Sequence, residues 1–176
     1  MAAGSAINST DTRGRVCDQP DSSRNVHIED LFVSNGDDGI ALKSGLDQYG
    51  RAVGMPTENV FIRNVTTYGR GGIAIGSEMS GGIRNVTVRE CAFWFKPDAP
   101  TSHKSGFGRN MHIKTCRGRG GYVDQIDVAD VDRGASKGFT ILAHSHHSGC
   151  NNSGLWPGES HCAACKYVRQ CASLQV

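Results

Sequence analysis

Short stretches in which apolar and polar residues alternate recur along this chain. Successive side chains of a β-strand point to opposite faces, so the alternation predicts strands with one buried face. A glycine-rich turn follows such a stretch, and a second alternating stretch comes after the turn. The pattern divides the chain into strand–turn–strand units, which are residues 25–44, 59–77, 85–115 and 125–143.

The repetition of these units favours a solenoid, because one coil cannot bury its own inward face whereas stacked coils share a continuous apolar column. We therefore predict an all-β fold, a parallel β-helix of about four coils, with an insertion near residues 94–107. An antiparallel sandwich also has short strands without a helical period and is the alternative. The apolar residues expected to face the core are Ile28, Ile40, Val60, Ile62, Ile73, Ile75, Val86, Val88 and Ile113.

The repeat also predicts where the domain begins and ends. Residues 18–143 are expected to form a partial β-helix domain, preceded by an irregular segment at residues 1–17 and followed by an irregular tail at residues 144–176. Histidines and cysteines crowd into this tail, and Cys162 and Cys165 have the spacing of zinc ligands. A second pair at similar spacing is missing, so we expect a loose tail and no metal site.

Composition narrows the classes of function. The 23 glycines and the 7% of aromatic residues are typical of a turn-rich β protein. The net charge is +2 and the basic residues are scattered, so we expect no nucleic-acid partner. No apolar run is long enough to span a membrane, and we expect no membrane partner.

Signals for export are mixed. Residues 1–15 lack the apolar core of a secretory signal, so we expect that the protein stays inside the cell or that its true N-terminus is missing. Asn-x-Ser/Thr sequons begin at Asn8, Asn64, Asn85 and Asn151, and they matter only if the chain is secreted.

Residues 36–39, Gly-Asp-Asp-Gly, carry the first candidate chemistry. Adjacent aspartates reach one cleft only if the backbone bends, and the flanking glycines permit a bend. Two close carboxylates repel, which raises one pKa and leaves the other group ionised, as a general acid and a general base require. The alternative is an ordinary Asp-Gly turn.

The sequence around these aspartates resembles that of a known family. Residues 20–30 read Pro-Asp-Ser-Ser-Arg-Asn-Val-His-Ile-Glu-Asp, and residues 36–45 read Gly-Asp-Asp-Gly-Ile-Ala-Leu-Lys-Ser-Gly. Residues 71–78 read Gly-Gly-Ile-Ala-Ile-Gly-Ser-Glu, and Ile-Lys-Thr follows at residues 113–115. In this order the motifs resemble the polygalacturonases, glycoside hydrolase family 28, over about residues 18 to 130.

The resemblance implies a right-handed parallel β-helix that hydrolyses the α-1,4-galacturonosyl links of pectin with inversion. It implies an extracellular or cell-wall location, pectin or polygalacturonate as the partner, a monomer, and no cofactor or metal. It assigns Asp37 as general acid, Asp38 as an activator of water, and Lys114 as the cation that binds a galacturonate carboxylate.

The chain also departs from the family pattern. The family's Asn-Thr-Asp motif is missing at its usual place, and Asp18 is a substitute at a different spacing. Arg70 stands near the place of the family's Gly-His-Gly histidine, and His112 replaces the arginine of Arg-Ile-Lys. Arg70 is otherwise read as a surface charge and His112 as a strand residue without chemistry. These departures, with the short length, predict a member truncated or altered at both ends.

Two other functions are weighed beside hydrolysis. The missing motifs favour a catalytically impaired relative that binds pectin, and they predict very slow hydrolysis by this chain. A β-helical lyase would need a different base and a calcium cluster, which we do not find in the sequence.

Overall fold

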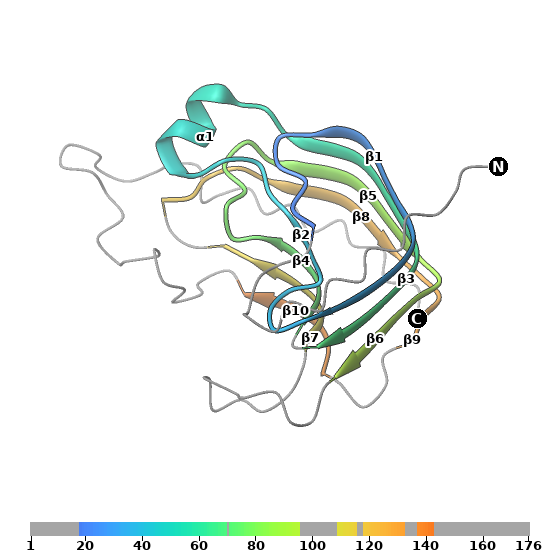
Figure 1. Ribbon diagram of the computed structural model, residues 1–176. Helices are drawn as coiled ribbons and strands as arrows, with labels where there is room; N and C mark the ends of the chain where they lie inside the picture. Colours follow the sequence, from blue (N-terminus) through green and yellow to red (C-terminus); the bar gives the residue numbers. More distant parts are fainter. Residues whose placement is uncertain (1–17, 70, 96–108, 116–117, 133–136, 143–176) are drawn as a thin grey trace.

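The computed structural model describes residues 18–69, 71–95, 109–115, 118–132 and 137–142, and Figure 1 shows it as stacked coils of strand. The segments 1–17 and 144–176, the cysteines with zinc spacing and Arg70 lie outside the described residues. Most of the insertion predicted near residues 94–107 lies outside them as well.

Two parallel sheets make up the solenoid. The first stacks four strands in the order β10-β7-β4-β2: β2 (Ile40–Leu42), β4 (Gly71–Gly76), β7 (Arg109–Lys114) and β10 (Lys137–Leu142). The second contains β1 (Arg24–Asn35), β3 (Thr57–Gly69), β5 (Ile83–Arg89), β6 (Cys91–Phe95), β8 (Val123–Val128) and β9 (Val131–Asp132). The strands of each sheet pair in parallel, so the solenoid prediction is confirmed and the antiparallel sandwich is wrong.

The long strands bend at residues with positive φ. Asn64 lies in the middle of β3 with φ 50°, and the strand pairs with β5 before this residue and with β6 after it. Asp30 makes the same bend in β1 with φ 54°. Asparagine and aspartate tolerate this left-handed conformation better than most residues, so the residue type at these positions favours the bend.

The core is the apolar column that the repeat predicts. Ile40, Val60, Ile62, Ile73, Ile75, Val86 and Val88 are buried, and Ile28 and Ile113 are partly buried and pack against them. Equivalent residues meet in register, as Ile40 does with Ile73. Each isoleucine therefore stacks on its counterpart in the next coil, as close packing of the interior requires.

The short helix α1 (Asp47–Val53) lies between β2 and β3 and is an element that the sequence did not predict. It ends at Gly54, which adopts the left-handed conformation that closes helices. Arg51 donates to the carbonyl of Gly118, and Arg119 lies 3.0 Å from Asp47, so the helix is fastened to a turn of a later coil. No helix in the described part of the chain has the length and apolar character needed to cross a bilayer.

Candidate active site

The turn between β1 and β2 carries the two aspartates. The side-chain amide of Asn35 donates to the carbonyl of Asp38 at 2.8 Å, and the backbone N–H of Asp38 donates to Oδ1 of Asp37 at 2.9 Å. Gly39 then donates its N–H to the carbonyl of Gly72 at 2.8 Å, which ties the turn to the next coil. The bend expected from the flanking glycines is present. The side chain of Asn35 stabilises this bend, a role that the sequence did not indicate.

The side chain of Asp38 crosses the neighbouring strand β4 and contacts β7. Its Oδ2 lies 2.6 Å from Nζ of Lys114, and its Oδ1 lies 3.4 Å from Nε2 of His112. Both partners belong to β7, whereas Asp38 precedes β2, and β4 runs between these two strands. The structure therefore brings Asp38 into contact with two residues that lie more than 70 positions later in the sequence.

Small residues on β4 make this reach possible. Ala74 and Gly76 stand opposite His112 and Lys114 in the strand register. A Cβ atom added to Gly71 would lie 2.8 Å from Oδ1 of Asp38, closer than side chains normally approach. The short side chains of β4 therefore form the floor over which the carboxylate crosses.

Burial strengthens the electrostatic interactions between the side chains of this cluster. Asp38 is 6% exposed, Lys114 9% and His112 1%. A charge removed from water is stable only when it is paired, so the Asp38 carboxylate and the Lys114 ammonium form a mutually dependent ion pair. Asp37 is the more exposed of the two aspartates.

Asp18 lies on the other side of the turn. It forms a parallel bridge with Ile40, and its carbonyl accepts the N–H of Ala41 at 2.8 Å. Adjacent strands are about 4.8 Å apart, so the backbone of Asp18 runs one strand away from the start of β2. The backbone of Asp18 thus lies beside the start of β2, next to the Asp37–Asp38 turn.

A second ion pair lies at the other end of β2. Lys43 hydrogen-bonds Glu78, whose side chain is 37% exposed. Burial raises the pKa of Glu78, but the hydrogen bond and charge of Lys43, a backbone hydrogen bond and the charge of Arg119 together outweigh it, so the pKa lies below its ordinary value. Sequence reasoning quoted Glu78 within a motif without giving it a role. The described residues contain no group of three or more His, Cys, Asp or Glu side chains that could hold a metal ion.

Comparison with known proteins adds the family context. The sequence profile of glycosyl hydrolases family 28 matches residues 7–147. The chain is 44% identical over 135 residues to a probable polygalacturonase of Vitis vinifera, covering 76% of this chain and 25% of that protein. It is 34% identical over 108 residues to a polygalacturonase of Ralstonia nicotianae, covering 61% of this chain and 17% of that one. The chain thus spans a quarter or less of the length of these relatives.

A solved structure shares the fold. The chain is similar to the crystal structure of a hyperthermoactive exopolygalacturonase from Thermotoga maritima, with a TM-score of 0.57 and 32% sequence identity. The match covers 71% of this chain and 28% of that chain. Parallel strands joined by crossovers are almost always connected with a right-handed sense, and the fold is a right-handed parallel β-helix.

Proposed function

This chain belongs to glycosyl hydrolases family 28, and we propose that it is a polygalacturonase-type hydrolase that cleaves α-1,4-galacturonosyl links in pectin with inversion. The observation that carries the proposal is the turn with two aspartates whose second carboxylate meets Lys114 across β4. An acidic polysaccharide requires carboxylates for the chemistry and a cation for the substrate, and both are present at this one point.

Asp37 is the proposed general acid. Its Oδ1 accepts the backbone N–H of Asp38, so Oδ2 is the oxygen that would carry a proton to the glycosidic oxygen. The leaving sugar would then depart with its electron pair and the proton from Asp37.

The base acts on the water that attacks the anomeric carbon. Asp38, paired with Lys114, is one candidate, and Asp18, whose backbone forms a bridge with Ile40, is the other. In inverting glycosidases the acid and base carboxyls stand about 6.5–9.5 Å apart, so that a water fits between base and sugar. A carboxylate on the neighbouring strand is better suited to such a gap than the adjacent residue.

Lys114, with His112 beside it, is the proposed contact for a galacturonate carboxylate, and Arg70, which precedes β4 in the sequence, is proposed as a further contact. Pectin or polygalacturonate is the proposed partner, in the extracellular space or the cell wall. We propose a monomer that uses no cofactor or metal and has no nucleic-acid or membrane partner.

A second candidate function rests on the same ion pair. The Asp38 carboxylate is engaged by Lys114 at 2.6 Å, which leaves it less available to activate a water molecule. A catalytically impaired relative that only binds pectin would retain such a pair. The two candidates differ in turnover and not in binding.

Reducing-sugar release from polygalacturonate over a long incubation separates them, with affinity electrophoresis in polygalacturonate as the measure of binding. Slow release that is lost in Asp37→Asn and retained in the remote control Asp30→Asn supports the hydrolase. Binding without release supports the impaired relative. A product that absorbs as an unsaturated uronide would reveal a lyase and contradict both.

A further inference from the structure

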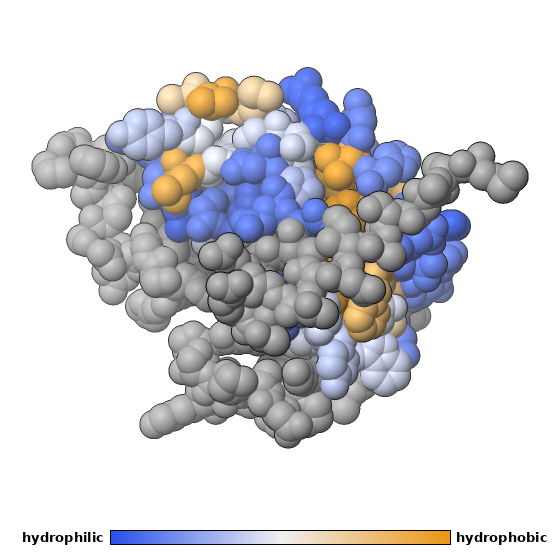
Figure 2. Space-filling view, in the orientation of Figure 1, coloured by the Kyte–Doolittle hydropathy of each residue, from blue (hydrophilic) through white to orange (hydrophobic). Residues whose placement is uncertain are grey.

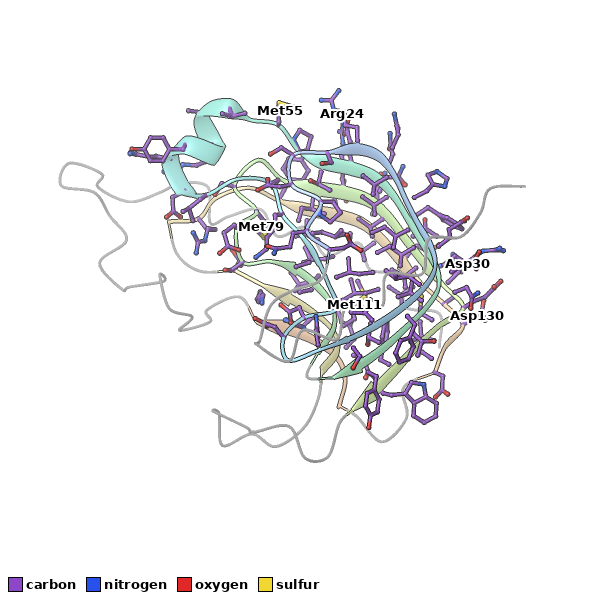
Figure 3. The ribbon with its side chains drawn as sticks, in the orientation of Figure 1. Arg24, Asp30, Met55, Met79, Met111 and Asp130 are labelled. Carbon is purple, nitrogen blue, oxygen red and sulfur yellow. The ribbon has the colours of Figure 1, made fainter. Side chains whose placement is uncertain are left out.

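The outer bends of the solenoid carry two stacks of residues with positive φ. The first stack consists of Asn25, Asn59, Asn85 and Gln125, and the second of Asp30, Asn64, Glu90 and Asp130. The strand registers place the members of each stack directly above one another. Figure 3 shows Asp30 and Asp130, the ends of the second stack, at the outer edge of the coils, and Figure 2 shows this side of the molecule to be hydrophilic.

Side-chain amides link the rungs of these stacks. Nδ2 of Asn59 donates to Oδ1 of Asn25 at 3.0 Å, and Oδ1 of Asn59 accepts from Nδ2 of Asn85 at 2.8 Å. In the other stack, Nδ2 of Asn64 donates to Oδ1 of Asp30 at 2.7 Å. Each amide therefore donates to the coil before it, and in Asn59 the carbonyl points towards the coil after it.

The geometry of a planar amide determines which hydrogen makes this bond. One N–H lies anti to the carbonyl oxygen and points opposite to the C=O bond, and the other lies syn and points away from Cβ. Asn59 donates and accepts in opposite directions along the stack, so it uses the anti hydrogen. The syn hydrogen then points outwards, away from the protein.

Two of the stacked asparagines begin sequons, Asn64-Val65-Thr66 and Asn85-Val86-Thr87. In both, the asparagine is exposed and the valine is buried in the core. We propose that Asn64 and Asn85 are N-glycosylation sites whose glycans leave the ladder hydrogen bonds intact. This inference rests on the extracellular location proposed above and is independent of catalysis.

The modification is compatible with the ladder because it replaces the hydrogen that the ladder does not use. Transfer from a lipid-linked oligosaccharyl diphosphate forms a bond between Nδ2 and the anomeric carbon. The anomeric carbon–oxygen bond breaks, the diphosphate leaves with the bonding pair, and Nδ2 loses one proton to a base. As in a trans peptide, the new substituent lies syn to the carbonyl oxygen and the remaining N–H lies anti, so the ladder donor is kept.

The arrangement of sequons also avoids crowding. Neighbouring rungs are about 4.8 Å apart, which is too close for two glycans to leave side by side. Each stack contains one sequon. Asn25 and Asn59 are followed by Val-His and Val-Phe, so they lack the serine or threonine that a sequon requires two positions later. The bends belong to the sheet of β1, β3 and β5, whereas Asp38 contacts β7 of the other sheet, so the glycans would not cover the candidate site.

The test expresses the full chain, with a secretory signal added, in a eukaryotic host that transfers N-glycans. Glycans are removed enzymatically in ¹⁸O-water, and mass spectrometry scores labelled aspartate at positions 64 and 85 in the secreted, protease-resistant protein. We expect labelling at both positions, loss at one position in each of Thr66→Ala and Thr87→Ala, and retention in Thr66→Ser and Thr87→Ser.

The double variant Thr66→Ala/Thr87→Ala is the reference for folding, because it keeps both asparagines. Equal protease resistance of the glycosylated chain and this variant supports the proposal. Protease resistance is measured both for protein secreted into the medium and for protein retained in the cells. Unlabelled asparagines in both fractions would overturn it. So would glycans confined to protease-sensitive material while the double variant is resistant.

Discussion

Asp38 has two buried neighbours, the Lys114 ammonium and the His112 imidazole, on β7, a strand that is not adjacent to β2. The pairing is mutual, since the carboxylate and the ammonium are both largely removed from bulk water. A single substitution in such a pair leaves an uncompensated buried charge, whereas a double substitution does not. This difference separates the pair's own contribution from the cost of breaking it.

Lys114→Met is therefore expected to destabilise the fold by about 3 kcal/mol, because Asp38 keeps its charge and loses its main partner. Asp38→Asn combined with Lys114→Met should lose clearly less. Urea unfolding of wild type, both single variants and the double variant closes a double-mutant cycle. Additive losses in that cycle would show that the two side chains do not interact.

Glu78 gives a pH-dependent contribution with a predictable sign. Its pKa in the folded protein lies below the ordinary 4.5, so its stabilisation is present above that value and disappears as the pH falls through the lower, folded pKa. Because the side chain is 37% exposed, we expect no more than about 1 kcal/mol.

The measurement is the free energy of unfolding of wild type and Glu78→Gln between pH 7 and pH 3. The wild type should be the more stable at pH 7, and the difference should vanish at the acid end. Glu29→Gln, which removes a carboxylate 3.9 Å from Arg63, provides the baseline for losing a surface charge. A difference that grows on acidification would refute the assignment.

The elements of this protein are long strands bent at fixed points, and the bends depend on residue type. Asn59 combines a φ of 56° with two ladder hydrogen bonds. Left-handed backbone costs most residues roughly 1–2 kcal/mol, and glycine is exempt. The backbone and hydrogen-bond contributions of the bend are therefore separable with two substitutions.

Asn59→Ala should lower the free energy of unfolding by about 2 kcal/mol, since it loses the ladder bonds and strains the backbone. Asn59→Gly loses the same bonds without the strain and should cost about half as much. Chemical denaturation of the two variants measures both. Equal losses would mean that backbone strain at this bend is negligible.

At the scale of the whole molecule, the proposed activity depends on groups from several coils. Asp18 precedes β2, the two aspartates follow β1, and Lys114 ends β7. The departures at Asp18 and Arg70 remove one base and one histidine from the family pattern. A positioned acid or base typically contributes about 10²–10⁴-fold to a rate.

We therefore expect this chain to hydrolyse polygalacturonate very slowly or not at all, whereas the longer Vitis vinifera relative should be active. Changing the relative's aspartate that corresponds to Asp37 to asparagine should abolish turnover and leave substrate binding largely intact. Reducing-sugar assays and affinity electrophoresis measure the two quantities. Rapid, Asp37-dependent hydrolysis by this chain would show that the departures matter little.

Much of the architecture was predictable because alternation and turn residues are local signals. The inward positions of Ile40, Ile73 and Val86 follow from a period of two and from stacking. The helix α1 was missed, since Asp47–Val53 has no apolar face that packs on the core and buries only Gly50. It is held by Arg51 and Arg119 instead, contacts that join residues more than 60 positions apart.

For the candidate site, residue identity and residue environment have different origins. The glycines around Asp37 and Asp38, the alternation and the family motifs are properties of adjacent residues. They sufficed for the fold and the family, and they led to the proposal of the two aspartates. The partner of Asp38 was decided by stacking, because the small side chains of β4 let a carboxylate of one coil meet Lys114 two strands away. The burial of that pair and the lowered pKa of Glu78 likewise depend on which coils lie in contact, and a distance through space has no counterpart in a local pattern.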